Sequence, residues 1–232
     1  MRMWSTCLTV WMAVGLLLPG LAQAQKAKTV EPFNGKDLTG WKTREPDKNE
    51  WVVGKAALNA GDPKELQVEA GGAELINAKG HGTDIYTEAT FGDCLLEVEV
   101  MVPQESNSGV YLMGEYEVQV LDSYGKKEIG QGDMGSIYSA ATALVNASKP
   151  AGEWQKFVID FRAPKFGAEG KKTANATFVK VTLNGQVIHE NIEVQKSTGG
   201  GVTGQEHATG PLMFQGNHGS VAYRNIKITP VN

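Results

Sequence analysis

Hydrophobic and polar residues alternate in short runs along most of the chain after residue 25. In the run LLEVEVMV, residues 95–102, the apolar side chains of Leu96 and two valines oppose Glu97 and Glu99. A period of two residues predicts β-strands with one buried face and one polar face. The same kind of run recurs at 108–114, 116–122, 154–164, 178–183, 186–190, 210–215 and 221–228.

Turn residues separate these runs and join some of them into hairpins. The two runs on either side of Gly114 are expected to pair in antiparallel fashion. Asn184-Gly185, between two other runs, is the strongest short hairpin signal in the chain. Helical periodicity is scarce after residue 25. About ten strands around a single core predict an all-β fold in which two antiparallel sheets pack as a β-sandwich.

One predicted strand, YEVQVLD at 116–122, carries an unusual row of polar residues. Tyr116 and two valines share the side that can be buried, whereas Glu117 and Gln119 share the other, with Glu115 just before them. This row either forms a solvated sheet face or faces a polar substrate. The second interpretation requires the strand to lie on the concave face of the curved sandwich.

Three stretches lack alternation and are expected to be loops. Residues 125–152 are rich in Gly, Ala and Ser and are long for a plain connection, which favours a functional role. Residues 197–211, STGGGVTGQEHATGP, form a second flexible segment, either an edge loop or a lid. Residues 43–50 are charged and are expected to be solvated.

The N-terminus has the pattern of a secretory signal peptide. A basic start at Arg2 precedes an apolar stretch, and Ala22 and Ala24 fit the small-residue cleavage rule. The prediction is a signal peptide over 1–24, cleaved near Ala24, and a periplasmic or extracellular mature protein. An uncleaved anchor is the alternative, although the apolar run is short for a membrane span. Cys7 lies inside this peptide and not at its end, which argues against a lipid-anchored cysteine.

Cleavage leaves about 208 of the 232 residues, and a single domain over 29–232 is predicted. Only Cys94 then remains, so no internal disulfide can form, and a buried Cys94 is expected. The net charge of −4 and the lack of a Lys/Arg block argue against nucleic-acid binding. No metal site is predicted, because the histidines show no i,i+4 spacing and there is no cysteine cluster. A calcium ion bound by loop carboxylates is the alternative that the sequence leaves open. The histidines are His81, His189, His207 and His218.

Seven phrases of the sequence lie, in this order, at 33–41, 91–112, 116–122, 135–139, 146–154, 183–185 and 210–228. Together they resemble the 3-keto-disaccharide hydrolase domain family over essentially the whole mature chain. The resemblance implies a concanavalin-like jelly roll and an exported bacterial protein acting on 3-keto-glycosides. The chain departs from the family where Met113 follows the NSG strand instead of arginine, and where QGNHG replaces QDHG.

A 3-keto sugar has an acidic hydrogen on C2, so a base can remove it and the C1 substituent can then leave. Such chemistry needs a base, a proton donor and a group that stabilises charge on the C3 oxygen. We predict Glu117 as the base; the alternative is a solvated strand carboxylate. Glu99 matches a family glutamate and is expected beside Glu117 if their strands are neighbours, where paired carboxylates could divide the acid and base roles. His218, in a loop, is the other candidate donor.

Six further residues are predicted to contact the substrate, each with a structural alternative. Asn107 and Asp122 also suit turns, and Tyr138 also suits a core. Arg224 can reach a ketone oxygen or pair with Glu99 or Glu117. The predicted substrate-binding set is Gln119, Asn107, Tyr138, Asp122, Gln215 and Arg224.

The predicted function is cleavage of 3-keto-glycosides by an exported glycoside hydrolase or lyase without a cofactor. Its partner is a small carbohydrate, with no nucleic acid and no membrane in the mature form. The alternative is a non-catalytic, lectin-like carbohydrate-binding module, since the same fold serves both roles. A third possibility is an interaction domain of a surface assembly. Outward carboxylates and an aromatic content of 8% favour catalysis.

Overall fold

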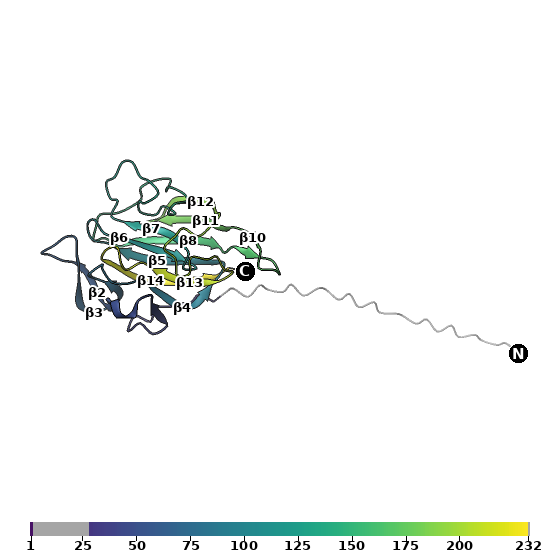
Figure 1. Ribbon diagram of the computed structural model, residues 1–232, viewed down its shortest axis with the longest axis horizontal. Helices are drawn as coiled ribbons and strands as arrows, with labels where there is room; N and C mark the ends of the chain where they lie inside the picture. The colour runs from purple at the N-terminus through teal and green to yellow at the C-terminus, as the bar shows by residue number, and fades with distance from the viewer. Residues whose placement is uncertain (2–27, 232) are drawn as a thin grey trace.

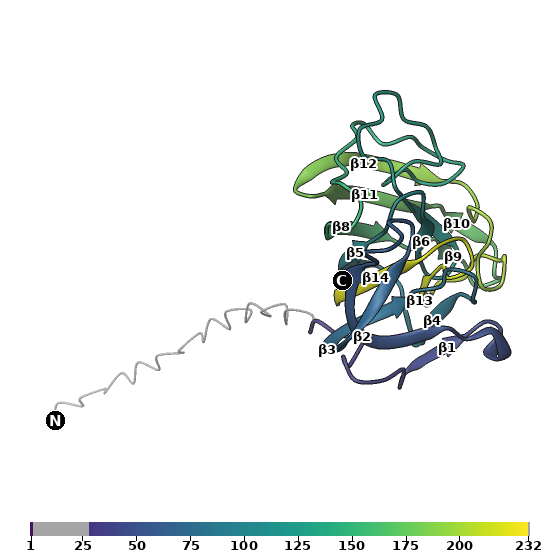
Figure 2. The same ribbon diagram turned by 90° about the vertical axis from the view of Figure 1, so that its left-hand side faces the viewer.

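The computed structural model describes Met1 and residues 28–231, so the predicted signal peptide lies outside the described residues. Two antiparallel sheets face each other (Figures 1 and 2). The five-stranded sheet has the order β1 (Trp41–Thr43), β4 (Ile85–Phe91), β13 (Gly210–Phe214), β6 (Asn107–Leu112) and β7 (Tyr116–Leu121).

The seven-stranded sheet forms the second layer, and Figure 2 shows β12, β11, β8, β5 and β14 following one another downward. A short pair, β9 (Lys165–Phe166) with β10 (Lys172–Ala174), and one 3-10 turn at Pro46–Lys48 complete the regular elements. The predicted all-β sandwich of the jelly-roll type is confirmed. The order in the larger sheet is β12 (Gln186–Val194), β11 (Ala176–Leu183), β8 (Gln155–Arg162), β5 (Cys94–Met101), β14 (Val221–Pro230), β3 (Leu66–Asn77) and β2 (Trp51–Leu58).

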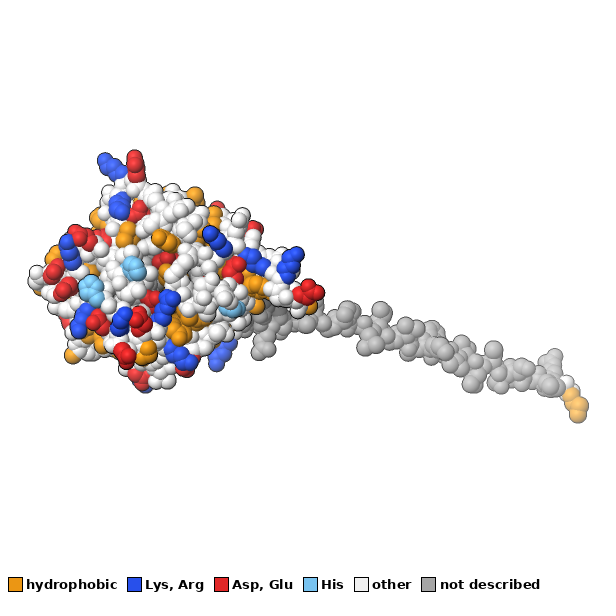
Figure 3. Space-filling model, in the orientation of Figure 1, with side chains coloured by type: hydrophobic (Ala, Val, Ile, Leu, Met, Phe, Trp, Pro, Cys, Tyr) orange, Lys and Arg blue, Asp and Glu red, His pale blue; other side chains and the backbone are white. Residues whose placement is uncertain are grey.

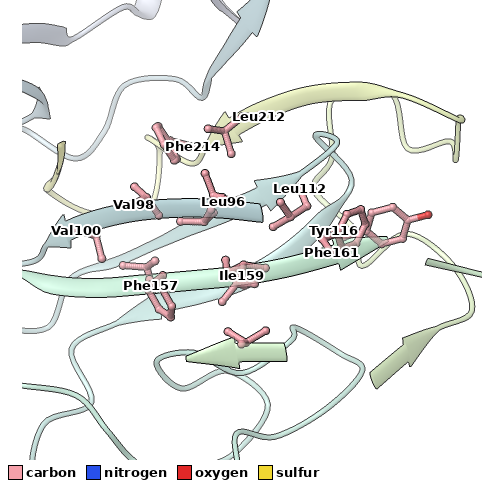
Figure 4. Packing of buried hydrophobic residues seen from close by; sticks show 14 of the residues in the cluster. Leu96, Val98, Val100, Leu112, Tyr116, Phe157, Ile159, Phe161, Leu212 and Phe214 are labelled. Atoms are coloured by element: carbon pink, nitrogen blue, oxygen red, sulfur yellow. The ribbon is translucent and has the colours of Figure 1, made fainter. Parts of the chain in front are cut away.

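The alternating runs place their apolar sides in the core between the sheets. Leu96 on β5 and Phe157 on β8 are fully buried, and Figure 4 shows them among the packed side chains. Aromatic pairs join the two layers: the rings of Tyr116 and Phe161 lie 5.5 Å apart. Burial of these apolar surfaces is the main stabilising term for the sandwich. Cys94 is buried as expected, and burial raises the pKa of its thiol to about 12.

Both predicted hairpins are confirmed. β6 pairs with β7 around a turn in which Met113 and Gly114 both have positive φ. β11 pairs with β12 through Asn184 and Gly185, whose φ angles of 52° and 83° are those that a two-residue turn of this kind requires. Met113, noted above as a departure from the family, is therefore a turn residue.

The stretch 125–152 covers the free edge of β7. Its backbone bonds with that of β7 at Gln119, where Gly135 N donates at 2.8 Å and Ser136 O accepts at 2.9 Å. The Tyr138 N–H donates to the Glu117 carbonyl at 3.1 Å. An exposed strand edge would otherwise offer unpaired backbone groups to other chains, so this loop closes the sheet.

The strands before residue 92 did not follow clearly from the sequence. β3 is mostly exposed over its first half and contains Gly71 and Gly72 at positive φ, where its pairing with β2 shifts register. Such a bulge breaks the alternation on which strand prediction depends. The charged stretch 43–50 is largely exposed, as expected.

Acidic and basic side chains are interspersed over the face of the molecule seen in Figure 3. That face carries no broad patch of a single charge. Among the described residues, no helix is long and apolar enough to cross a membrane.

Candidate functional site

A cavity of about 230 Å³ lies on the side of the β6–β7 hairpin that faces away from the core. Six residues predicted from the sequence meet there, from two strands and two loops. Tyr111 and two glycines of the loop 197–211 also line the cavity. The lining is Asn107, Tyr111, Glu117, Gln119, Tyr138, Gly199, Gly200, Gln215 and His218.

Strand alternation and pairing register place the central side chains. Tyr116, Val118 and Val120 face the core. Glu117 and Gln119, which alternate with them, therefore face the cavity. In the ladder Tyr111 pairs with Glu117, and Gly109 pairs with Gln119. Glu117 therefore lies beside an aromatic hydroxyl on a rigid pair of strands and not in bulk water.

Gly109 leaves the space that the Glu117 carboxylate occupies. A Cβ at position 109 would lie 2.3 Å from Glu117 Oε1 and 2.8 Å from Tyr111 Cε2. Both distances are far shorter than any normal contact. The glycine of the NSG phrase is thus required for the close approach of Glu117 to β6.

Glu117 is a buried carboxyl with an altered proton affinity. Only 3% of the residue is exposed, and burial raises the pKa of its carboxyl to about 7. A hydrogen bond with Tyr111 acts to lower this pKa, whereas the negative charge of Asp84 acts to raise it. A carboxylate with a pKa near neutrality is well matched to proton abstraction at physiological pH.

Tyr111 is the main residue of the cavity that the sequence did not indicate. It is 1% exposed, and burial, followed by the charge of Glu117, raises the pKa of its hydroxyl, which therefore stays protonated. Gln215 Nε2 lies 3.5 Å from the Tyr111 hydroxyl. Tyr111 lies four residues after Asn107 and therefore on the same face of β6. This spacing is the signal that could have identified Tyr111 from the sequence.

Gln119 and Asn107 form an amide wall of the cavity. Gln119 Nε2 donates to Asn107 Oδ1 at 2.6 Å. A pair of amides held this way presents donors and acceptors in fixed directions, which suits the vicinal hydroxyls of a sugar ring.

Tyr138 and His218 lie at the mouth of the cavity. Tyr138 is 44% exposed and comes from the segment that seals β7. His218 is exposed, and its Nδ1 is hydrogen-bonded to Asn217 Oδ1. Both can reach a group that projects from a bound sugar toward solvent.

Glu99 does not lie beside Glu117, so that prediction is wrong. It belongs to β5, whose neighbours are β8 and β14 in the seven-stranded sheet. Its outward side chain faces away from the core on the opposite layer. Arg224 Nε donates to Glu99 Oε2 at 2.7 Å. Partial burial acts to raise the pKa of Glu99, but the hydrogen bonds from Arg224 and Asn225 lower it below the ordinary value.

Arg224 and Asp122 also lie outside the cavity. Arg224 pairs with Glu99 and Glu74 and lies 4.0 Å from the centre of the Trp154 ring, so its role is structural. Asp122 Oδ2 accepts from the Glu105 N–H at 3.1 Å, closing the far end of the β6–β7 hairpin. The carboxylate of Asp122 therefore joins the two ends of the hairpin, and does not contact the cavity.

Glu115, the first residue of the polar row, anchors the loop 197–211. Its carboxylate accepts from Thr203 N at 2.8 Å, from Thr203 Oγ1 at 2.7 Å and from Gly204 N at 3.1 Å. The residue is 2% exposed. These bonds hold Gly199 and Gly200 against the cavity, so the predicted edge loop or lid forms one of its walls.

Three other hollows of similar size in the described part of the chain differ from the Glu117 cavity in the side chains that line them. One of about 290 Å³ is lined by Ser139 and residues 193–198, and two of about 260 Å³ lie near Glu105 and near Glu99. Their carboxylates are exposed or partly exposed. Only the Glu117 cavity, among the described residues, combines a buried carboxyl of raised pKa with convergent polar groups. No group of three or more His, Cys, Asp or Glu side chains arranged for a metal occurs in the described part of the chain.

Comparison with known proteins shows the family of the chain. Residues 28–229 match the family described as the 3-keto-alpha-glucoside-1,2-lyase-like domain. The chain belongs to this family. No curated protein sequence is significantly similar to this chain.

Two crystal structures from Parabacteroides distasonis ATCC 8503, each described as a "putative glycosyl hydrolase", resemble this chain. One has 28% sequence identity and a TM-score of 0.68, with 88% of this chain and 84% of that chain covered. The other has 21% identity and a TM-score of 0.57, with coverages of 88% and 94%, and shows the fold alone. Family and fold together support a carbohydrate-active function.

Proposed function

We propose that this protein cleaves 3-keto-glycosides by elimination and that Glu117 is the base. The Glu117 carboxylate takes the proton from C2, and the C2–H electron pair forms an enolate with the C3 ketone. The bond from C1 to the glycosidic oxygen then breaks, and the departing oxygen takes up a proton. Water adds to the resulting enone, with hydroxyl at C1 and a proton at C2, so the net reaction is hydrolysis.

The single observation that carries this proposal is the buried carboxyl of Glu117, with its pKa of about 7, facing a polar cavity. A purely carbohydrate-binding module has no need of such a group, because burying a carboxyl that must ionise near neutral pH destabilises the fold. The family description, a 1,2-lyase-like domain, agrees with elimination across C1 and C2.

The neighbouring groups suit the remaining steps. The protonated Tyr111 hydroxyl is placed beside Glu117 and can donate to the oxygen that becomes negative as the C2 proton leaves. Gln119 and Asn107 bind ring hydroxyls. His218 and Tyr138, at the mouth, are the groups nearest to solvent for protonating the leaving oxygen. The aglycone then departs outward.

A matched pair of substrates tests this proposal. A 3-keto-glucoside of a chromogenic phenol is expected to release phenol, whereas the same glucoside without the ketone is not, because its C2 hydrogen is not acidic. Since only the ionised carboxyl acts as a base, kcat/KM should rise with pH and level off above a midpoint near 7. Equal release from both substrates would contradict elimination, and release from neither would favour the binding-module alternative.

A further inference from the structure

An ion pair behind the cavity connects two of its walls. Asp84 immediately precedes β4 and is 3% exposed, and Arg44 immediately follows β1. The Arg44 N–H donates to the Asp84 carbonyl at 3.0 Å, which continues the β1–β4 ladder by one rung. The two side chains are thereby held next to each other, with Arg44 Nη1 3.3 Å from Asp84 Oδ2.

Each partner of the pair holds a different wall. Asp84 Oδ1 accepts from the Gly216 N–H at 3.1 Å, and Gly216 directly follows Gln215 of the cavity. Arg44 Nη1 donates to the carbonyl of Gly200 at 2.9 Å, in the loop that Glu115 anchors. The β1–β4 end of the sheet is thus linked to two of the three loop segments that line the cavity, those of Gly200 and Gln215.

We propose that Asp84 and Arg44 are positioning residues of the catalytic cavity, which hold the loop walls at Gly200 and Gln215 and act on Glu117 through their charges. The inference rests on the proposed function of Glu117. Neither residue lines the cavity, so neither needs to touch the substrate.

Electrostatics gives the two partners opposite effects on Glu117. The carboxylate of Asp84 disfavours a second negative charge nearby and makes Glu117 more basic, and the same charge acts on Tyr111. The guanidinium of Arg44 offsets part of the Asp84 charge. The other titratable groups around Glu117 are Tyr111 on β6, Tyr138 in the sealing segment, His218 after β13, Tyr223 on β14 and Glu115, which immediately precedes β7.

The test measures the pKa of Glu117 itself. The carboxyl carbon signals of the full chain, labelled with 13C-glutamate, are recorded by NMR as the pH is changed. The Glu117 signal is assigned by its loss in Glu117→Gln. We expect Asp84→Asn to lower this pKa by on the order of one unit, and Arg44→Gln to raise it, because the Asp84 charge is then uncompensated. The matched control is Glu97→Gln, which removes a partly exposed ion pair with Lys156 on the other sheet and should leave the pKa unchanged.

The opposite signs separate this proposal from a merely structural role. If Asp84→Asn does not fold, Arg44→Gln decides alone, since the Arg44 side chain is 42% exposed and its replacement is tolerable. An unchanged or lowered pKa in Arg44→Gln, or equal shifts in the Glu97→Gln control, would overturn the proposal. The measurement needs no substrate, so a protein that shows these shifts but no phenol release would refute the proposed function and not the role of the pair.

Discussion

Replacing Glu117 by glutamine is expected to abolish most activity while making the folded protein more stable at neutral and alkaline pH. Glutamine is nearly isosteric but cannot accept the C2 proton, so kcat/KM should fall by roughly 10²- to 10⁴-fold or more. Steady-state kinetics on the 3-keto-glucoside measure this loss. Wild-type kcat/KM in the variant would remove Glu117 from the mechanism.

The stability gain follows from the raised pKa of the Glu117 carboxyl. The folded protein keeps this proton up to a pH of about 7, whereas the unfolded chain releases it near its ordinary value of 4.5. Stability is therefore lost as the pH rises from 4.5 to 7, and the full cost is present above 7. A rise of the pKa from 4.5 to about 7 corresponds to about 3 kcal/mol of the free energy of unfolding, which Glu117→Gln should recover at pH 8.

Denaturant unfolding at pH 8 and pH 5 measures this effect. The advantage of Glu117→Gln should be large at pH 8 and small at pH 5, where Glu117 of the folded wild type is already protonated. A variant less stable than the wild type at pH 8 would show that the carboxylate is stabilised in the fold, contrary to the raised pKa. Opposite changes in activity and stability are the signature of a group placed for function.

Replacing Gly109 by alanine is expected to lower kcat/KM by about 10²-fold without unfolding the protein. The new methyl group would overlap Glu117 Oε1 and the edge of the Tyr111 ring, so the carboxylate must move by about an ångström. Because the clashing atoms are the ends of side chains, the strands need not separate. The pKa of Glu117 should fall as its carboxylate moves toward solvent, shifting the rate profile to lower pH.

Gly132→Ala is the matched control for Gly109→Ala. Gly132 has no heavy atom near its would-be Cβ and no positive φ, so alanine should be neutral there. Circular dichroism and thermal unfolding would establish that both variants are folded. Unchanged kinetics in Gly109→Ala would contradict the requirement for close approach between Glu117 and β6.

Sequence patterns predicted the strand faces well because alternation is a local property. The parity of residues 116–121 placed Glu117 and Gln119 on the face opposite to Val118, and the structure confirms this. The Asn184-Gly185 turn was equally clear, since few other residues accept its backbone angles.

Long-range arrangement was the part that alternation could not predict. Glu99 is on an outward face, as its parity indicates, but parity does not say which sheet a strand joins. Asp84, by contrast, lies near the site because it bonds to Gly216, which is more than a hundred positions further along the chain. The loop that completes the cavity is fixed by Glu115, whose partners lie almost ninety positions further along the chain.

The fate of the C2 hydrogen is the most direct test of the account. The wild-type protein should be given a 3-keto-glucoside in heavy water, and the released sugar examined by NMR at early times against an enzyme-free control. Elimination followed by water addition is expected to place deuterium at C2 of the released sugar, because the proton on the Glu117 carboxyl exchanges with heavy water before C2 is protonated again. Glu117→Gln should release almost no sugar. Release of the aglycone at the full rate with hydrogen retained at C2 would contradict proton abstraction by Glu117.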